Sequence, residues 1–317
     1  MYISLDDILS QIPIESICNY DFDYVGDKYD IIRVSSTRNI PKVREQMITS
    51  EAVLYGGLKY DSSPIATQKE SSIHYSTNRS IQENLFDLMT DSITKEFRSS
   101  NKYLPWTKVE VDSIYTLLSN SKNVKEVRLY KEEKGVEESF KMLSGNSPSI
   151  IHIATHGLFV DDNPTDHAHF LGGCRSDNSF GSSALIFSGA NNVWSGKAVP
   201  DGVEDGVLLA EEIATMNLTE TELVVLSACE TGLGKITSEG VFGLQRAFKK
   251  AGVQTIIMSL WKVDDAATSM FMQSFYKHWL AGASKHDAFA LAQETVRSYP
   301  EKDWESPYFW AGFIMLD

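Results

Sequence analysis

The chain has 317 residues, of which 42% are hydrophobic and 23% are charged, as in a folded globular protein with a sizeable core. The net charge of −14 argues against nucleic-acid binding, and the three widely spaced cysteines argue against a disulfide framework or a Cys-rich zinc site. No apolar run reaches the ~18–20 residues of a membrane span and the first residues lack a signal-peptide pattern, so we expect a cytoplasmic protein without membrane partners.

In the first half of the chain, apolar runs predict short strands and helical spacing of apolar residues predicts helices. Strands are expected at 2–5, 31–34 and 52–55, and helices at 81–97, 108–119 and 135–143. The polar stretch 61–80 is expected to form a surface loop. The sequence shows no internal repeat in this region or later.

The second half alternates between strands and helices. Strands are expected at 150–154, 184–187, 223–227, 253–260 and 308–315, and helices at 207–214, 240–251, 266–280 and 285–298. Long loops are expected at 157–183 and 191–205. This alternation predicts an α/β fold with a mostly parallel sheet and helices on both faces.

Two of the predicted strands each end at a side chain suited to nucleophilic catalysis. The run 150–157 ends in His156 and Gly157, and the run 223–229 ends in Cys229. Ligands of open α/β sheets bind outside the carboxyl ends of the strands, and a nucleophilic thiol needs a neighbouring base. We therefore expect a His156–Cys229 dyad, with the backbone N–H groups of Gly157 and Cys229 as an oxyanion hole.

Other readings of these residues compete with this one. Cys229 would also suit a small buried hydrophobic position, and His156 a hydrogen-bonded loop position. His152 lies within an apolar strand and is expected to be a packed core residue rather than a metal ligand, so no metal or cofactor is expected.

An acidic pair, Asp264 and Asp265, follows a later strand end in the run Trp-Lys-Val-Asp-Asp. Strand-end loops beside a nucleophile line substrate pockets, and carboxylates there would hold a Lys or Arg side chain. The same two residues also suit the N-cap of the helix expected at 266–280. The sequence leaves both roles open for both residues.

Several ordered blocks resemble the CHAT domain, a caspase-like domain often found behind tetratricopeptide repeats in bacteria. They are the runs 152–157, 184–190, 205–213, 224–232, 239–252 and 259–265. The resemblance implies a caspase-haemoglobinase-like three-layer sandwich and a clan CD cysteine endopeptidase with His156 and Cys229 as its dyad. It also implies that residues 1–145 form the amino-terminal half of the domain, possibly pseudo-caspase-like, and residues 146–317 the catalytic core.

The resemblance leaves the biological role to two hypotheses. The first is a peptidase that cleaves a specific partner protein, under control of a tetratricopeptide-repeat or sensor partner, in a bacterial regulatory, defence or cell-death pathway. A run similar to 261–265 in separases contacts a basic P1 side chain, which favours cleavage after Lys or Arg. The alternative is a catalytically silent scaffold that keeps the fold for protein binding.

Overall fold

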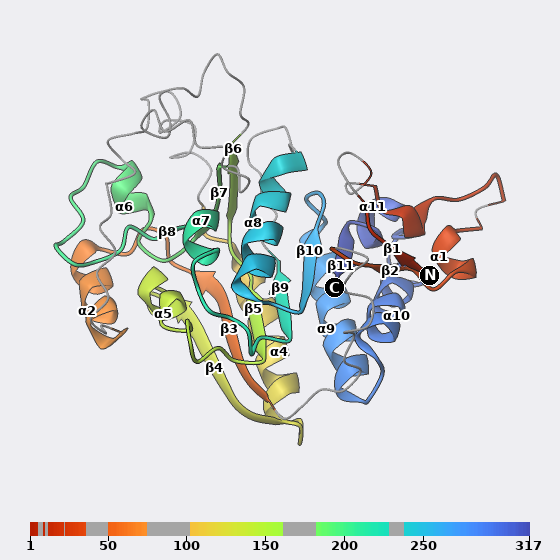
Figure 1. The fold of residues 1–317 in the computed structure, drawn as a ribbon, viewed down its shortest axis with the longest axis horizontal. Coiled ribbons are helices and arrows are strands. Elements are labelled where there is room, and N and C mark those ends of the chain that lie inside the picture. The colour runs from red at the N-terminus through yellow and green to blue at the C-terminus, as the bar shows by residue number, and fades with distance from the viewer. Residues whose placement is uncertain are drawn as a thin grey trace, which may run out of the picture.

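The computed structural model describes residues 1–5, 9, 12–21, 23–35, 50–74, 102–160, 182–227 and 238–317. Its centre is an eight-stranded sheet (Figure 1). Every neighbouring pair of strands in this sheet is parallel except β10 and β11. In spatial order the strands are β1 (Tyr2–Ile3), β2 (Ile32–Arg33), β11 (Phe313–Leu316), β10 (Thr255–Ser259), β9 (Leu223–Leu226), β5 (Ile150–Ile153), β3 (Ser50–Leu58) and β4 (Val124–Glu132).

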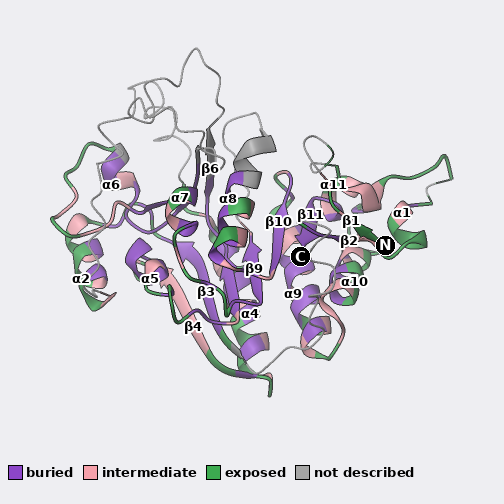
Figure 2. Ribbon diagram, in the orientation of Figure 1, coloured by how far each residue is buried: buried purple, intermediate pink, exposed green. Residues whose placement is uncertain are grey.

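Helices cover both faces of the sheet and make three layers, as predicted from the sequence. One face packs against α4 (Pro105–Ser119), α9 (Asp265–Leu280) and α10 (Lys285–Arg297). The other face packs against α5 (Glu137–Lys141), α7 (Ala210–Ile213) and α8 (Ser238–Ala251). Figure 2 shows the buried residues concentrated in the central strands and in the helix faces turned toward them.

Alternate residues of each central strand serve the two cores. Val224 and Ile256 belong to the α8 side, whereas their neighbours Val225 and Ile257 belong to the α4 and α9 side. This alternation follows from the two-residue period of a strand. Complete burial of such a side chain contributes about 1.5–3 kcal/mol, so these central strands anchor the fold.

A second, antiparallel sheet lies on the α8 side, with β7 in the middle. It consists of β6 (Gly157–Val160), β7 (Ser182–Ile186) and β8 (Val207–Leu209). Leu185 and Leu208 are fully buried in the same core as α8. The small sheet is therefore part of the α8-side core, and its first strand, β6, begins shortly after β5 ends. The remaining elements are η2 (Ile14–Ser16), α1 (Val25–Lys28), α2 (Pro64–His74), α6 (Asn191–Trp194) and α11 (Pro307–Trp310).

Some predicted elements are wrong in type or extent. The stretch 61–80, expected to be a loop, contains a helix from Pro64 to His74. The sequence did not predict this helix because its only buried residues are Thr67 and Ser71, which are polar and give no apolar periodicity. The expected loop 157–183 begins with β6, the expected helix 207–214 begins with β8, and the expected strand 308–315 begins with the short helix α11. The helix expected at 81–97 lies outside the described residues.

Strand β4 was not predicted at all. Its sequence, Val-Lys-Glu-Val-Arg-Leu-Tyr-Lys-Glu, has no continuous apolar run because it forms the edge of the sheet. Charged side chains on an edge strand discourage pairing with another chain. The charged residues that protect this edge also interrupt the apolar pattern from which a strand would be predicted.

Candidate active site

His156 stands three residues beyond the end of β5 and is only 2% exposed. Its Nε2 atom lies 2.8 Å from the carbonyl oxygen of Lys102. A carbonyl oxygen can only accept a hydrogen bond, so Nε2 carries the proton. The ring also packs against Tyr60, with 4.9 Å between the ring centroids. The hydrogen bond and the ring contact together fix the orientation of the imidazole.

The carboxyl end of β9 lies level with that of β5. Ile153 pairs with Leu226, and the next backbone N–H, that of Ser227, donates to the Ile153 carbonyl oxygen at 2.9 Å. His156 is three residues beyond one member of that pair, and Cys229 is three residues beyond the other. Cys229 itself lies outside the described residues.

The small sheet holds the backbone around His156 and Gly157. The Ile186 N–H donates to the His156 carbonyl oxygen at 3.0 Å, and Gly157 pairs with Leu185 as β6 begins. On the preceding residue, the Thr155 hydroxyl donates to the Ile186 carbonyl oxygen at 2.5 Å. Gly157 is therefore a fixed backbone position immediately after the histidine.

His152 is completely buried on the α4 and α9 side of the sheet. Its Nε2 lies 2.9 Å from Oε1 of Glu110, and its Nδ1 lies 3.3 Å from the hydroxyl of Tyr276. The second oxygen of Glu110 accepts a hydrogen bond from the Ser227 hydroxyl at 3.1 Å. His152 is thus a packed, hydrogen-bonded core residue, as the sequence indicated.

The Asp264–Asp265 pair divides into two structural positions. Asp264 is the N-cap of α9, and its side chain accepts from the N–H groups of Ala266 and Ala267 at 3.0 and 3.1 Å. Asp265 lies in the first turn, is exposed and lines a pocket. The N-cap role therefore belongs to Asp264, and the substrate-binding role stays a prediction for Asp265, the member of the pair that lines the pocket.

That pocket opens at the carboxyl edge of the central sheet. Thr155, Ser227 and Ser259 each follow or close one of three adjacent strands, β5, β9 and β10, and all three line it. Helix α4 supplies a further wall. The remaining lining residues are Leu104, Trp106, Thr107, Glu110, Lys262, Val263, Asp265, Thr268 and Phe313.

Two contacts fix the loop between β10 and α9 that forms part of this pocket. The Trp261 indole N–H donates to the Tyr308 carbonyl oxygen at 3.0 Å, and the Tyr308 hydroxyl donates to the Lys262 carbonyl oxygen at 2.9 Å. Gly312 lies directly beneath this loop, where a Cβ would come within 2.4 Å of a Val263 methyl carbon. The loop is therefore seated on α11 and the start of β11.

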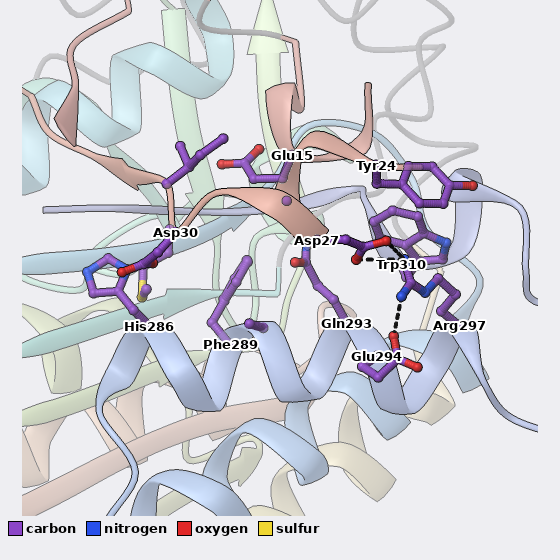
Figure 3. Close-up of a pocket in the computed structure, with 14 residues that line it drawn as sticks. Glu15, Tyr24, Asp27, Asp30, His286, Phe289, Gln293, Glu294, Arg297 and Trp310 are labelled. Atoms are coloured by element: carbon purple, nitrogen blue, oxygen red, sulfur yellow. Dashed lines mark hydrogen bonds and ion pairs between the residues drawn. The ribbon is translucent and has the colours of Figure 1, made fainter. Parts of the chain in front are cut away.

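A second cavity, of about 110 Å³, lies between α10 and the segment around α1 (Figure 3). Its central cation is Arg297, which pairs with Asp27 at 3.1 Å and with Glu294 at 2.6 Å. The guanidinium also lies over the rings of Tyr24 and Trp310, at 5.3 and 5.6 Å. These contacts tie the amino-terminal segment to α10.

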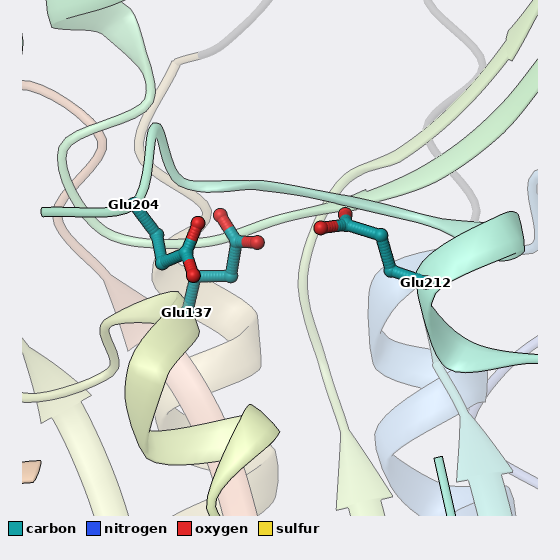
Figure 4. Close-up of side chains that lie close together, drawn as sticks. All are labelled: Glu137, Glu204 and Glu212. Carbon is teal, nitrogen blue, oxygen red and sulfur yellow. The ribbon is translucent and has the colours of Figure 1, made fainter. Parts of the chain in front are cut away.

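Three carboxylates, those of Glu137, Glu204 and Glu212, gather between α5, α7 and the segment before β8 (Figure 4). The ammonium of Lys141 lies 2.7, 3.0 and 2.7 Å from them in that order. Lys141 is therefore the cation of this cluster. The Glu137 carboxylate also accepts from the Gly206 N–H at 2.9 Å, which fixes the entry into β8.

Two parts of the site were not predicted. The Lys102 carbonyl group belongs to no motif, and Glu110 lies in a helix whose sequence shows only its apolar face. Thr107, Val111, Ile114 and Leu118 form the buried face of that helix, and Glu110 is the one acidic residue on this face. An acidic residue within an otherwise uncharged helix face was the available sequence signal for Glu110.

Comparison with known proteins gives a consistent family. A family model described as the CHAT domain matches residues 1–317. The chain is 34% identical to human tetratricopeptide repeat protein 28 over 181 residues, which are 52% of this chain and 7% of that protein. It is also 34% identical to the mouse protein of the same name over 110 residues, 35% of this chain and 4% of that one. The chain thus spans less than a tenth of these relatives.

Among solved structures, the Arg-specific cysteine proteinase gingipain R is similar with a TM-score of 0.42 and 9% identity, over 90% of this chain and 53% of that one. In the described part of the chain, no helix combines the length and apolarity needed to cross a bilayer.

Proposed function

The chain belongs to the CHAT-domain family, and we propose that it is a cysteine endopeptidase in which His156 and Cys229 form the catalytic dyad. The observation that carries the proposal is the pairing of Ile153 with Leu226 at the ends of two neighbouring strands. His156 follows Ile153 by three residues, and Cys229 follows Leu226 by three residues. Neighbouring strands lie about 4.8 Å apart. We therefore expect the two side chains, which follow level strand ends, to come within reach of each other.

The proposed reaction begins with proton transfer from the Cys229 thiol to Nδ1 of His156, because Nε2 carries a proton toward Lys102. The thiolate attacks the carbonyl carbon of the scissile peptide, and the N–H groups of Gly157 and Cys229 stabilise the oxyanion. His156 then protonates the leaving amine as the C–N bond breaks. Water hydrolyses the thioester and regenerates the thiol.

The proposed specificity is for a basic P1 side chain, as expected from the acidic pair after β10. Asp265 supports this because it lines the pocket beside Ser227, two residues before Cys229. The N-cap contacts of Asp264 already use its carboxylate. We therefore propose Asp265 as the substrate-binding member of the pair and Asp264 as a support of the loop.

Control by a partner is part of the proposal. His156 is only 2% exposed, so a local rearrangement would ease the approach of a substrate carbonyl and raise the rate above that of the isolated chain. A tetratricopeptide-repeat or sensor protein would supply that trigger, and the matched relatives carry such repeats in their names. The bacterial defence or cell-death setting expected from the sequence stays a prediction, as does a cytoplasmic location. A full, partner-independent rate on short peptides would contradict control by a partner.

The test is cleavage of a fluorogenic peptide library scanned at P1, with wild type, Cys229→Ala and His156→Ala. We expect cleavage after Lys or Arg by wild type and a loss of at least ~10³-fold in each variant, as for a removed nucleophile or base. Circular dichroism and thermal melting control for the fold. Cleavage retained in Cys229→Ala would refute the dyad.

A further inference from the structure

The pocket beside Ser227 has a buried acidic floor that the sequence analysis did not assign to substrate binding. Glu110 lines this pocket from α4 and is 3% exposed, whereas Lys262 and Asp265 also line it but are exposed. Lys262 and Asp265 thus bring one positive and one negative charge to the exposed rim of the pocket. Glu110 is therefore the buried charge of the pocket.

The hydrogen bonds around Glu110 give its carboxylate donors without giving it a counter-ion. An ionised carboxylate only accepts, so His152 donates through Nε2 and Ser227 donates through its hydroxyl. Nδ1 of His152 then accepts from the Tyr276 hydroxyl, whose pKa is raised by burial and by the nearby Glu110. Every proton of this chain has an acceptor when His152 is neutral.

The alternative, a protonated His152, would turn its Nδ1–H toward the Tyr276 oxygen. The phenolic hydrogen would then need another acceptor, and the described residues around Tyr276 provide none. Over the same residues, no Lys or Arg forms an ion pair with Glu110. The arrangement thus leaves one negative charge beneath the pocket.

We propose that Glu110 is the specificity-determining residue of this pocket and that it selects a cationic side chain of the substrate. The proposal deepens the peptidase function and rests on it for the identity of the ligand as a P1 side chain.

The geometry also explains why this charge comes from α4. Gly56 and Gly57 let the helix lie against β3, since a Cβ on Gly56 would come within 2.6 Å of Val111. The Gly57 N–H donates to the Thr107 hydroxyl at 2.9 Å, one helical turn before Glu110. This close packing carries the carboxylate to the strand ends that precede His156 and Cys229.

The test separates binding from catalysis by using Cys229→Ala as the background for binding. Binding of n-butylguanidinium and of the neutral, nearly isosteric n-butylurea is measured by NMR titration. We expect the guanidinium to bind at least ~10-fold more tightly, and we expect Glu110→Gln to remove most of that preference although Asp265 is still present. Asp112→Asn is the matched control, because Asp112 lies on the same helix but faces Lys131 with a 43% exposed side chain.

Equal binding of the two ligands to the Cys229→Ala protein would overturn the proposal, and so would a preference that survives undiminished in folded Glu110→Gln. Glu110→Asp, which keeps the charge, should retain part of the preference and guards against a Glu110→Gln protein that fails to fold. In otherwise wild-type enzyme, Glu110→Gln should lower the ratio of kcat/KM for Arg over norleucine peptides by at least ~10-fold. If no peptide is cleaved but the guanidinium preference depends on Glu110, the peptidase proposal fails and the pocket assignment stands.

Discussion

His152 and His156 lie four residues apart along one stretch of chain, yet their hydrogen bonds place them in different environments. The two ring nitrogens of His152 contact the side chains of Glu110 on α4 and Tyr276 on α9. The Nε2 of His156 instead donates to a backbone carbonyl oxygen, that of Lys102. As the proposed base, His156 would accept the thiol proton at Nδ1, because Nε2 already carries a proton.

Asp205 gives a prediction at the scale of one residue. Burial raises its pKa to about 6, and the Val207 N–H, which donates to it at 2.8 Å, opposes that rise. Its folded pKa therefore exceeds the usual value of 3.8, so the folded protein binds more protons than the unfolded chain between about pH 4 and pH 6. This contribution to stability grows as the pH falls through that range.

The measurement compares wild type with Asp205→Asn by urea denaturation at pH 7 and pH 5. Relative to the variant, wild type should gain about 1 kcal/mol of unfolding free energy at the lower pH. Burial raises the pKa of Glu137, and the charge of Asp205 raises it further, so Asp205→Asn also lowers the pKa of Glu137 and the measured difference includes both groups. Parallel pH profiles for the two proteins would contradict the assigned environment of Asp205.

At the scale of elements, the contact of α4 with β3 governs where Glu110 lies. Replacing Gly56 with Ala would place a methyl group 2.6 Å from a Val111 methyl carbon and 2.7 Å from the Thr107 carbonyl oxygen. We expect Gly56→Ala to lower the free energy of unfolding by about 1–3 kcal/mol, the usual cost of overpacking, and to weaken the guanidinium preference by displacing α4.

Chemical denaturation and the same NMR titration measure these two effects. Val109→Ala is the control on the same helix, since Val109 is 48% exposed and should change neither quantity appreciably. A Gly56→Ala protein with wild-type stability and wild-type ligand preference would show that the close approach of α4 does not position Glu110.

The elements also show where sequence patterns suffice. The central strands β5, β9 and β10 were predicted because each is buried on both faces and reads as an unbroken apolar run. The edge strand β4 and the exposed helix α2 were not, because neither buries a continuous apolar surface. Periodicity reports burial, so elements at the surface of the fold leave little signal.

On the scale of the whole molecule, one sheet joins both halves of the sequence. Strands β3 and β4 precede residue 145, and β3 pairs directly with β5 from Ala52↔Ile150 to Tyr55↔Ile153. A fragment comprising residues 146–317 would lose this partner and expose β5 as an unprotected apolar edge. The proposed halves, 1–145 and 146–317, are therefore expected to depend on each other for folding.

Expression of the two fragments tests this dependence. Residues 146–317 alone should be insoluble or aggregated by size-exclusion chromatography, whereas co-expression with residues 1–145 should recover soluble protein. A soluble fragment 146–317 that unfolds cooperatively on its own would contradict the expectation.

The candidate site was predictable to the extent that it follows strand ends. The predicted site residues come shortly after buried strands, whose apolar runs can be recognised in the sequence. They are His156, Gly157 and the loop that holds Asp264 and Asp265. Glu110 and the Lys102 carbonyl group precede their histidine partners by 42 and 54 residues, and only the folded arrangement of α4 and the residues before it brings them there. Long-range packing of this kind has no local pattern.

The central claim is that His156 activates the Cys229 thiol. The most direct measurement is intact-mass labelling with an Arg-directed peptidyl acyloxymethyl ketone, in a Cys18→Ser background because Cys18 is an exposed free thiol. We predict one adduct, mapped to Cys229, whose rate of formation falls by at least ~10²-fold in His156→Ala. No adduct at Cys229, or an equal rate in the His156→Ala protein, would contradict the dyad.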